Sequence, residues 1–323
     1  MGNPFDVLVT GLVVVDVLVR LPQKIHRGEK QEVGELLVTG GAPAGNAACV
    51  LSSLGWRTGY MARLGCDTIS QIARAELTRC GVEDSLIVHD AEASAGVAVV
   101  EIDPASGERT VFYNLSSYHY LRPSDIPLET VRSARLALVD GYETEAARAI
   151  LEITHATGIP SVLDLEAGDP AILRSLLELG THAILPLAAA AKLTDQTLPA
   201  DALHSLASWT NAQLVVTDGL RGAWALTPDG ILHQPAFAVH AVDTTGCGDA
   251  FHGAYASALL DGWPLPLRLE FAAFIASRVA MRMGGRTDLP SAASLPTLDL
   301  SLLSLELQTR IRARRPSKII RTP

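Results

Sequence analysis

Disulfide and metal-binding patterns are missing from this sequence. Its four cysteines are scattered without a CxxC pair, and its nine histidines include no HxxxH or HxH pair. Unpaired, scattered cysteines are typical of a reducing compartment, so we expect a cytoplasmic protein without a Cys/His metal centre.

A basic surface and a membrane segment are also missing. The chain has 26 Lys and Arg against 35 Asp and Glu, a net charge of −9, which argues against a nucleic-acid partner. The apolar N-terminal stretch MGNPFDVLVTGLVVVDVLVRLP lacks a basic leader and contains Asp6 and Asp16. It therefore predicts a strand rather than a signal peptide or a membrane span, and we expect no membrane partner.

The sequence does contain enough hydrophobic residues to form a large core. The 323 residues are 48% hydrophobic, with a mean hydropathy of +0.23. Apolar, β-branched stretches, the first spanning residues 5–19, alternate with helix-like segments. This alternation predicts an α/β fold with a mostly parallel central sheet flanked by helices on both faces. We expect one domain over residues 1–305, followed by a solvated basic C-terminal extension over 306–323.

One stretch departs from the alternation. Residues 96–114 read as two strands around Asp-Pro-Ala-Ser-Gly, a hairpin. With residues from about 17 to 38, the stretch from about 95 to 120 predicts a small β lid beside the main sheet. Exposed lid strands are edges that pair with other chains, so we expect a homodimer through the lid.

The segment VDTTGCGDAFHGA, residues 242–254, is the richest in chemistry. It joins a strand-like stretch to a helix-like one, and the amides of Gly246, Cys247, Gly248 and Asp249 can form an anion hole at the helix N-terminus. A glycine turn with Asp249 as helix cap is the alternative. An anion hole beside a carboxylate suits phosphoryl transfer, with Asp249 accepting the proton of the attacked hydroxyl.

This segment resembles the C-terminal signature D-T-x-G-A-G-D of ribokinase-like carbohydrate kinases, the PfkB family. The stretch VTGGAPAGNAACVLSSLGWRTGYMARLGCD, with its double glycine, Asn46, Gly65 and Asp67, resembles the N-terminal signature. Two distant motifs in the right order are a specific signal. The resemblance covers nearly the whole chain and implies a ribokinase-like fold and an ATP-dependent carbohydrate kinase.

The resemblance also implies site residues. Asp249 would be the catalytic base, with the anion hole formed by Gly246, Cys247 and Gly248. Sugar contacts fall on Asp16, Gly40, Gly41 and Asn46, for which a strand-end turn, a glycine turn and a helix start are the alternatives. Asp16 would meet a sugar hydroxyl at the carboxyl edge of the sheet, and Asp243 would face the metal. From the lid, Asn114, Arg109 and His119 could reach the ligand, or Arg109 could lie in a solvated turn.

The nucleotide side is implied by VVTDGLRGAWAL and by FAAFIASRVAMRMGGR. The candidates are Thr217, Gly219, Gly222, Ala273 and Ser277, with turn glycines and helix packing as alternatives. ATP and Mg²⁺ are the expected cofactors. Carbonyls near Asp243 and Gly284–Gly285 could also hold K⁺.

Two departures from the family pattern stand out. The magnesium-organising Asn-x-x-Glu falls on Pro186 and Ala189, so Mg²⁺ would be held by ATP phosphates, waters and Asp243. Cys247 replaces the usual alanine. One hypothesis is that the amide-rich helix start lowers the pKa of Cys247 and makes the kinase oxidation-sensitive.

For the substrate, the motifs look most like the sulfofructose kinase branch. The sulfonate-binding arginine of that branch is missing, because Gly141, Tyr142 and Glu143 occupy its loop. Glu143 suits hydroxyls and favours a neutral sugar, such as a ketose. A sulfofructose kinase, a nucleoside kinase and a non-catalytic sugar or nucleotide sensor are the alternatives.

Overall fold

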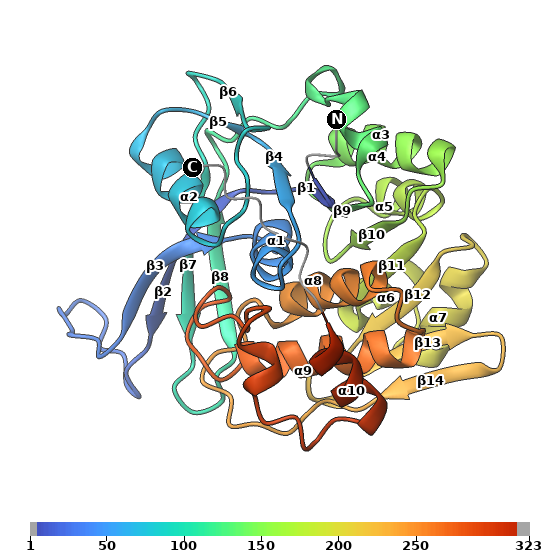
Figure 1. Cartoon of the computed structure of the whole chain (residues 1–323). Helices are drawn as coiled ribbons and strands as arrows, with labels where there is room; N and C mark the ends of the chain where they lie inside the picture. The colour runs from blue at the N-terminus through green and yellow to red at the C-terminus, as the bar shows by residue number, and fades with distance from the viewer. Residues whose placement is uncertain (1–4, 315–323) are drawn as a thin grey trace.

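The computed structural model describes residues 5–314. In this range a large sheet carries helices on both faces, and a smaller sheet stands beside it (Figure 1). This architecture confirms the fold class predicted from the strand–helix alternation. Among the described helices, none combines the length and the apolar character needed to cross a membrane.

The large sheet places the carboxyl ends of parallel strands at one edge. Counted over residues 5–314, it has eight strands in the order β14-β13-β12-β11-β10-β9-β1-β4. Their bounds are β1 (Val7–Thr10), β4 (Thr58–Met61), β9 (Leu136–Asp140), β10 (Ser161–Asp164), β11 (His182–Pro186), β12 (Gln213–Thr217), β13 (Ala223–Thr227) and β14 (Gly230–Gln234). The strands from β4 to β12 pair in parallel, and the hairpin β13–β14 extends the sheet in antiparallel fashion. Ligands of such sheets bind at the carboxyl edge.

Two groups of helices cover the large sheet (Figure 1). One face carries α1 (Pro43–Ser53), α8 (Cys247–Leu260) and α9 (Leu265–Val279); the other carries α4 (Thr144–Thr157), α5 (Pro170–Leu177), α6 (Leu187–Thr194) and α7 (Pro199–Ala207). The remaining elements are α2 (Thr68–Arg79), α3 (Leu128–Ser133), α10 (Leu305–Ala313), the short pair β5 (Arg63–Leu64) and β6 (Val88–His89), and the 3-10 turns η1 (Pro123–Asp125), η2 (Gly219–Arg221) and η3 (Leu295–Thr297).

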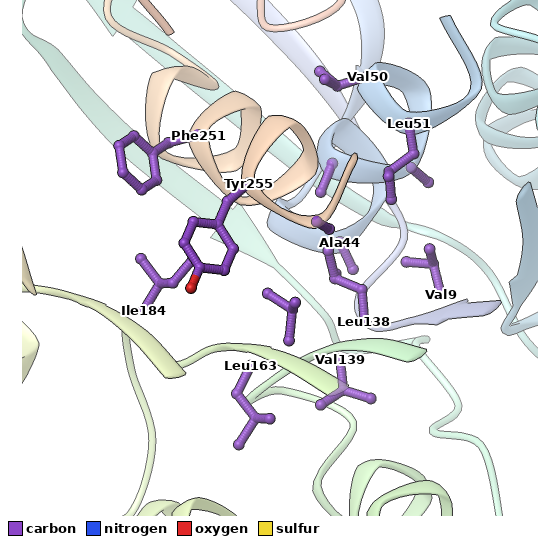
Figure 2. Packing of buried hydrophobic residues seen from close by; sticks show 14 of the residues in the cluster. Val9, Ala44, Val50, Leu51, Leu138, Val139, Leu163, Ile184, Phe251 and Tyr255 are labelled. Atoms are coloured by element: carbon purple, nitrogen blue, oxygen red, sulfur yellow. The ribbon is translucent and has the colours of Figure 1, made fainter. Parts of the chain in front are cut away.

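Helices α1 and α8 pack closely over the middle of the sheet. Leu51 of α1 and Tyr255 of α8 lie in the same cluster as Leu138, Leu163 and Ile184 of the strands (Figure 2). A Cβ at Gly253 of α8 would lie 2.7 Å from the Ala47 carbonyl oxygen of α1, so only glycine permits this approach. This packing fixes the N-termini of both helices at the same edge of the sheet.

The first predicted strand is in fact two strands. β1 ends at Thr10, and β2 (Val14–Arg20) begins after a break and belongs to the smaller sheet. At the break, the Leu12 amide donates to Asp140 Oδ2 at 2.9 Å, and a Cβ at Gly11 would lie 2.1 Å from that oxygen. Asp16 therefore lies on β2 rather than at the edge of the large sheet, which corrects the sequence-based expectation.

The smaller sheet spans the two stretches from which the sequence predicts the lid. Within residues 5–314 it has four strands in the order β3-β2-β7-β8, where β3 is Leu36–Gly41, β7 is Gly96–Ile102 and β8 is Arg109–Asn114. Its β7–β8 turn is bonded to the loop before α8, because the Thr244 amide donates to the Gly107 carbonyl oxygen at 3.2 Å. The lid therefore touches the segment that carries the richest chemistry.

Two local expectations were wrong. The strand-like stretch expected before segment 242–254 is irregular over residues 235–242, since β14 ends at Gln234. The basic tail is not solvated from residue 306, because α10 buries Leu307 and Ile311, which lie four residues apart on one helix face. Arg314 then donates to Asp261 Oδ2 at 2.6 Å. The rest of the expected extension, 315–323, lies outside the described residues.

Candidate active site

A cavity of about 120 Å³ lies between the lid, α1 and the N-terminus of α8. This volume is below the roughly 300–1,000 Å³ of pockets for drug-sized ligands, which fits a small ligand. Its lining residues are Leu12, Val14, Asp16, Ala42, Pro43, Asn46, Ala98, Val100, Arg109, Val111, Tyr113, Tyr142, Glu166, Thr245, Gly246 and Asp249.

The start of α8 opens into this cavity without a side-chain cap. Gly246 is the N-cap residue with φ of 77°, and a Cβ there would lie 2.5 Å from the Gly285 Cα. The first amides of a helix lack intrahelical partners, and nothing lies within 4 Å of a Cβ placed on Gly248. The Thr245 hydroxyl oxygen is buried without a hydrogen-bond partner in the described structure. The Cys247 amide donates to the Thr244 carbonyl oxygen at 3.3 Å, and the rest of this helix start leaves room and donors for an anion.

Asp249 does not cap its own helix. It is the third residue of α8, and its Oδ2 accepts a hydrogen bond of 2.6 Å from Asn46 Nδ2 at the start of α1. The two sequence motifs, 203 residues apart in the chain, therefore meet at this contact.

Glu166 is a site residue that the sequence analysis missed. It follows β10 by two residues and lines the cavity, where the Tyr142 hydroxyl donates to its Oε1 at 3.1 Å. Burial, followed by the negative charge of Asp249, raises the pKa of Glu166 to about 7. Its position just after an apolar strand was a usable signal, since the carboxyl ends of parallel strands share one edge.

Glu143 does not take the role expected from the sequence. Its side chain is 1% exposed and is absent from the cavity lining, because it accepts hydrogen bonds from the Tyr118 hydroxyl at 2.7 Å and the Leu121 amide at 2.8 Å. The neighbouring Tyr142 reaches the cavity instead. Glu143 thus ties the chain after the lid to the start of α4.

Strand alternation on β8 decides which lid residues reach the cavity. Arg109, Val111 and Tyr113 line it, so Asn114 belongs to the opposite face. The Asn114 side chain accepts a hydrogen bond from the Ser116 amide at 2.9 Å. Asn114, the residue predicted to contact the sugar, is therefore outside the cavity lining, and Tyr113 lines the cavity instead. His119 pairs with Asp90 at 3.0 Å and is also outside the lining.

From the sequence, Arg109 could either reach the ligand or lie in a solvated turn, and the structure combines these two positions. It begins β8 next to the hairpin turn, yet it lines the cavity, and its Nη1 donates to the Thr244 carbonyl oxygen at 3.2 Å. Its guanidinium therefore stands beside the loop that leads into α8.

The double glycine leaves space for two side chains near the cavity. Neither Gly40 nor Gly41 is among the lining residues, whereas Ala42 is. A Cβ on Gly41 would lie 2.1 Å from Asp16 Oδ2, and one on Gly40 would lie 1.9 Å from Arg286 Nη1. The two glycines make room for these side chains rather than line the cavity.

Ala42 holds a backbone conformation that normally requires glycine. Its φ of 69° and ψ of 151° lie in a region where a non-glycine residue costs roughly 1–3 kcal/mol. We expect Ala42→Gly to raise Tm by roughly 1–3 °C, because the released strain exceeds the added entropy of the unfolded chain. Differential scanning calorimetry checks this, with Ala48→Gly in the interior of α1 as the matched control. The control should lower Tm; a lower Tm for Ala42→Gly would contradict the strain.

Asp243 bridges two loops. It is completely buried, its Oδ1 accepts from the Thr245 amide and its Oδ2 accepts from the Gly284 amide, both at 2.8 Å. It is not a lining residue, so its magnesium role stays a prediction, as does the K⁺ site. Among the described residues, no three His, Cys, Asp or Glu side chains are grouped to hold a metal ion by themselves.

The redox hypothesis for Cys247 is not supported. Burial raises the pKa of its thiol to about 12, which is opposite to the lowering expected at the helix start. The small thiol packs against the core.

The residues assigned to the nucleotide are not among those that line the cavity. Thr217 ends β12, Gly219 begins η2, Gly222 follows η2, and Ala273 and Ser277 lie on α9. Gly222 has a structural reason to be glycine, because a Cβ there would lie 2.1 Å from the Gln234 carbonyl oxygen. Their ATP contacts stay predictions.

Comparison with known proteins identifies the family of this chain. The sequence profile of the pfkB family carbohydrate kinases matches residues 5–292. The chain is 25% identical to the 5-dehydro-2-deoxygluconokinase of Geobacillus thermodenitrificans, covering 92% of each chain. It is 32% identical to a fructokinase of Klebsiella pneumoniae over 66% of this chain and 74% of that one. A ribokinase candidate from Agrobacterium tumefaciens superimposes with a TM-score of 0.84 at 25% identity, covering 97% and 98% of the two chains.

The profile match spans both signature motifs, the lid and the large sheet. The chain therefore belongs to the pfkB family of carbohydrate kinases, which are ATP-dependent sugar kinases.

Proposed function

We propose that this kinase transfers the γ-phosphoryl group of ATP to a hydroxyl of a small neutral sugar, a ketose or a related carbohydrate. Asp249 accepts the hydroxyl proton, and the amides of Gly246, Cys247 and Gly248 stabilise the transferring group. The observation that carries the proposal is the uncapped N-terminus of α8 opening into a cavity in which Asp249 is held by Asn46.

The charges of the cavity favour a neutral sugar. Three carboxylates, Asp16, Glu166 and Asp249, line it against one guanidinium, that of Arg109. Carboxylates accept hydrogen bonds from hydroxyls and repel acidic groups. Arg109 already donates to the Thr244 carbonyl oxygen next to α8, so its charge acts at the phosphate end.

Magnesium would enter with the phosphates of ATP and keep several waters. Pro186 and Ala189 offer no side-chain oxygen, whereas the Glu166 carboxylate lies in the same cavity as Asp249 and supplies a hard oxygen donor. Glu166 is therefore the residue of this chain that would take the place of the missing glutamate. All four cysteines are free, which supports a cytoplasmic location.

The outer face of the lid supports a homodimer. Val38, Val17, Val99 and Phe112 stand in register across its four described strands, and Val38, Val99 and Phe112 are 46%, 42% and 56% exposed. β3 and β8 are the two edges of this sheet. A second copy of the chain would cover this apolar row and pair an edge strand.

Introducing a charge into this row should separate the two copies. We expect Phe112→Glu to convert a dimer into a monomer, because burying the carboxylate opposes association. Light scattering coupled to size-exclusion chromatography measures the mass, with Leu302→Glu as a control at an exposed leucine near α10. A wild type that is monomeric at all concentrations would contradict the dimer.

The proposed reaction is tested by ADP release over a panel of ketoses, aldoses, polyols, sugar acids, sulfosugars and nucleosides. Phosphorylated product is identified by mass spectrometry, and Asp249→Asn, prepared in parallel, controls for contaminating kinases. Turnover of a neutral sugar is the expected result. Preference for a sugar acid or a sulfosugar would overturn the neutral-sugar assignment, nucleoside turnover would favour a nucleoside kinase, and ligand binding without turnover would favour a sensor.

A further inference from the structure

Arg286 is a buried cation directly behind the proposed catalytic base. It lies in the loop after α9, and its side chain belongs to a residue only 4% exposed. Its Nε donates to Asn46 Oδ1 at 2.8 Å, and its Nη2 donates to the Gly41 carbonyl oxygen at 2.6 Å. One guanidinium therefore joins the sugar-side loop to the start of α1.

The surrounding backbone is shaped to admit this side chain. A Cβ on Gly40 would lie 1.9 Å from Nη1, and a Cβ on Gly45 would lie 2.4 Å from Nη2. Burying a guanidinium is costly, and Nη1 has no hydrogen-bond partner within the described structure. The two donors that do have partners, Nε and Nη2, define the task of this side chain.

The task follows from the two ends of the Asn46 amide. Its Oδ1 accepts from Arg286, and its Nδ2 donates to Asp249 Oδ2 at 2.6 Å. The oxygen and nitrogen ends of an amide have nearly the same shape, so sterics alone do not select one orientation. A guanidinium can only donate, and therefore it selects the orientation in which the NH₂ group faces Asp249.

We propose that Arg286 is a positioning residue, which sets the orientation of the Asn46 amide and through it holds the Asp249 carboxylate against the bound hydroxyl. This inference rests on the proposed function, in which Asp249 is the base. Without Arg286 the amide can turn its oxygen toward the carboxylate, and the two oxygens repel. Lysine does not replace arginine here, because one ammonium cannot match a planar fork that bonds Asn46 and Gly41 together.

A double-mutant cycle tests the proposal. We expect Arg286→Met to lower kcat on the order of 10- to 100-fold, since small displacements of a reacting group have effects of this size. The KM for ATP should change less than about twofold, because the residues predicted to contact the nucleotide do not include Arg286 or its partners. In an Asn46→Ala background, Arg286→Met should add less than about a twofold loss. Multiplicative losses would overturn the relay through Asn46.

Three further variants keep the test decisive. Arg282→Met makes the same change at an exposed arginine of the same loop and should leave kcat unchanged. Asn46→Asp keeps an acceptor for Arg286 but removes the donor to Asp249, and it should be as impaired as Asn46→Ala. Arg286→Lys replaces Arg286→Met if the latter does not fold; full kcat in Arg286→Lys would overturn the proposal.

Failure of the proposed function is distinguishable from failure of this inference. A wild type without turnover on any sugar would contradict the kinase mechanism only. The NMR resonances of the Asn46 side-chain amide then report on its hydrogen bonds directly. They should shift and broaden in Arg286→Lys; unchanged resonances would overturn the role of Arg286.

Discussion

Asp249→Asn is expected to lower kcat by about 10²- to 10⁴-fold, the range that a positioned general base contributes. The asparagine keeps the size of the side chain and can still accept the hydrogen bond from Asn46, so the local structure is retained. What is lost is the group that receives the proton as the hydroxyl attacks the phosphorus. The KM for the sugar should change only a few-fold, because the lost interaction develops in the transition state.

Steady-state kinetics with the sugar selected by the panel measures this effect. Asp249→Glu is the matched variant, since it keeps the carboxylate but moves it by one methylene, and its kcat should fall between those of the wild type and Asp249→Asn. Circular dichroism and Tm establish that each variant is folded. Equal turnover in the wild type and Asp249→Asn would contradict the base assignment.

Asp16→Asn should weaken sugar binding rather than the chemical step. The Asp16 carboxylate lines the cavity and is 7% exposed, yet within residues 5–314 no protein group donates a hydrogen bond to it. Sugar hydroxyls are the partners that remain. A hydrogen bond to a charged group is worth about 1.5–3 kcal/mol, so we expect the KM for the sugar to rise roughly 10- to 100-fold with kcat within a few-fold.

Asp16→Asn, which should weaken sugar binding, should increase the stability of the folded protein most at alkaline pH. Burial, partly offset by the charge of Arg286, raises the pKa of Asp16 from 3.8 to about 7. The folded state therefore binds the Asp16 proton more tightly than the unfolded state does. The resulting stabilisation is complete below about pH 4 and is lost as the pH rises through 7. Asparagine carries no such pH dependence. The Tm of Asp16→Asn minus that of the wild type should therefore be larger at pH 8 than at pH 5.

Thermal melts at the two pH values, with and without sugar, check both effects. Sugar should raise the Tm of the wild type much more than that of Asp16→Asn, because ligand stabilisation follows affinity. Asn114→Asp, on the same lid but outside the cavity, is the control and should bind sugar normally. An Asp16→Asn variant with unchanged KM, or with a Tm difference that shrinks from pH 5 to pH 8, would contradict the role of Asp16.

The sequence by itself determined the parts of this protein that depend on local chemistry. Alternation of apolar strands and amphipathic helices predicted the parallel sheet with two covered faces, and Asp-Pro-Ala-Ser-Gly predicted the β7–β8 hairpin. Glycines around Asp249 predicted a helix start that opens to an anion. Each is a property of neighbouring residues, and so each could be recognised before any contact was known.

The tertiary structure decided which side chains share the cavity. Asp140, far along the chain, accepts a hydrogen bond from the Leu12 amide where the first predicted strand is interrupted, and Asp16 lies beyond this break, in the lid. On β8 the cavity is lined by Tyr113 rather than by its neighbour Asn114, because successive side chains of a strand point to opposite faces. Glu166 rather than Glu143 reaches the cavity, since Tyr118 and Leu121 hold Glu143 elsewhere.

Arg286 shows most clearly what the sequence alone does not reveal. Nothing in its local sequence indicates a buried guanidinium, and its partner Asn46 is 240 residues away. The contact exists because the loop after α9 returns to the N-terminus of α1, where Gly40 and Gly45 leave space for the side chain. The sequence identified the chemistry of each motif, and only the packing of the chain brought the motifs to one cavity.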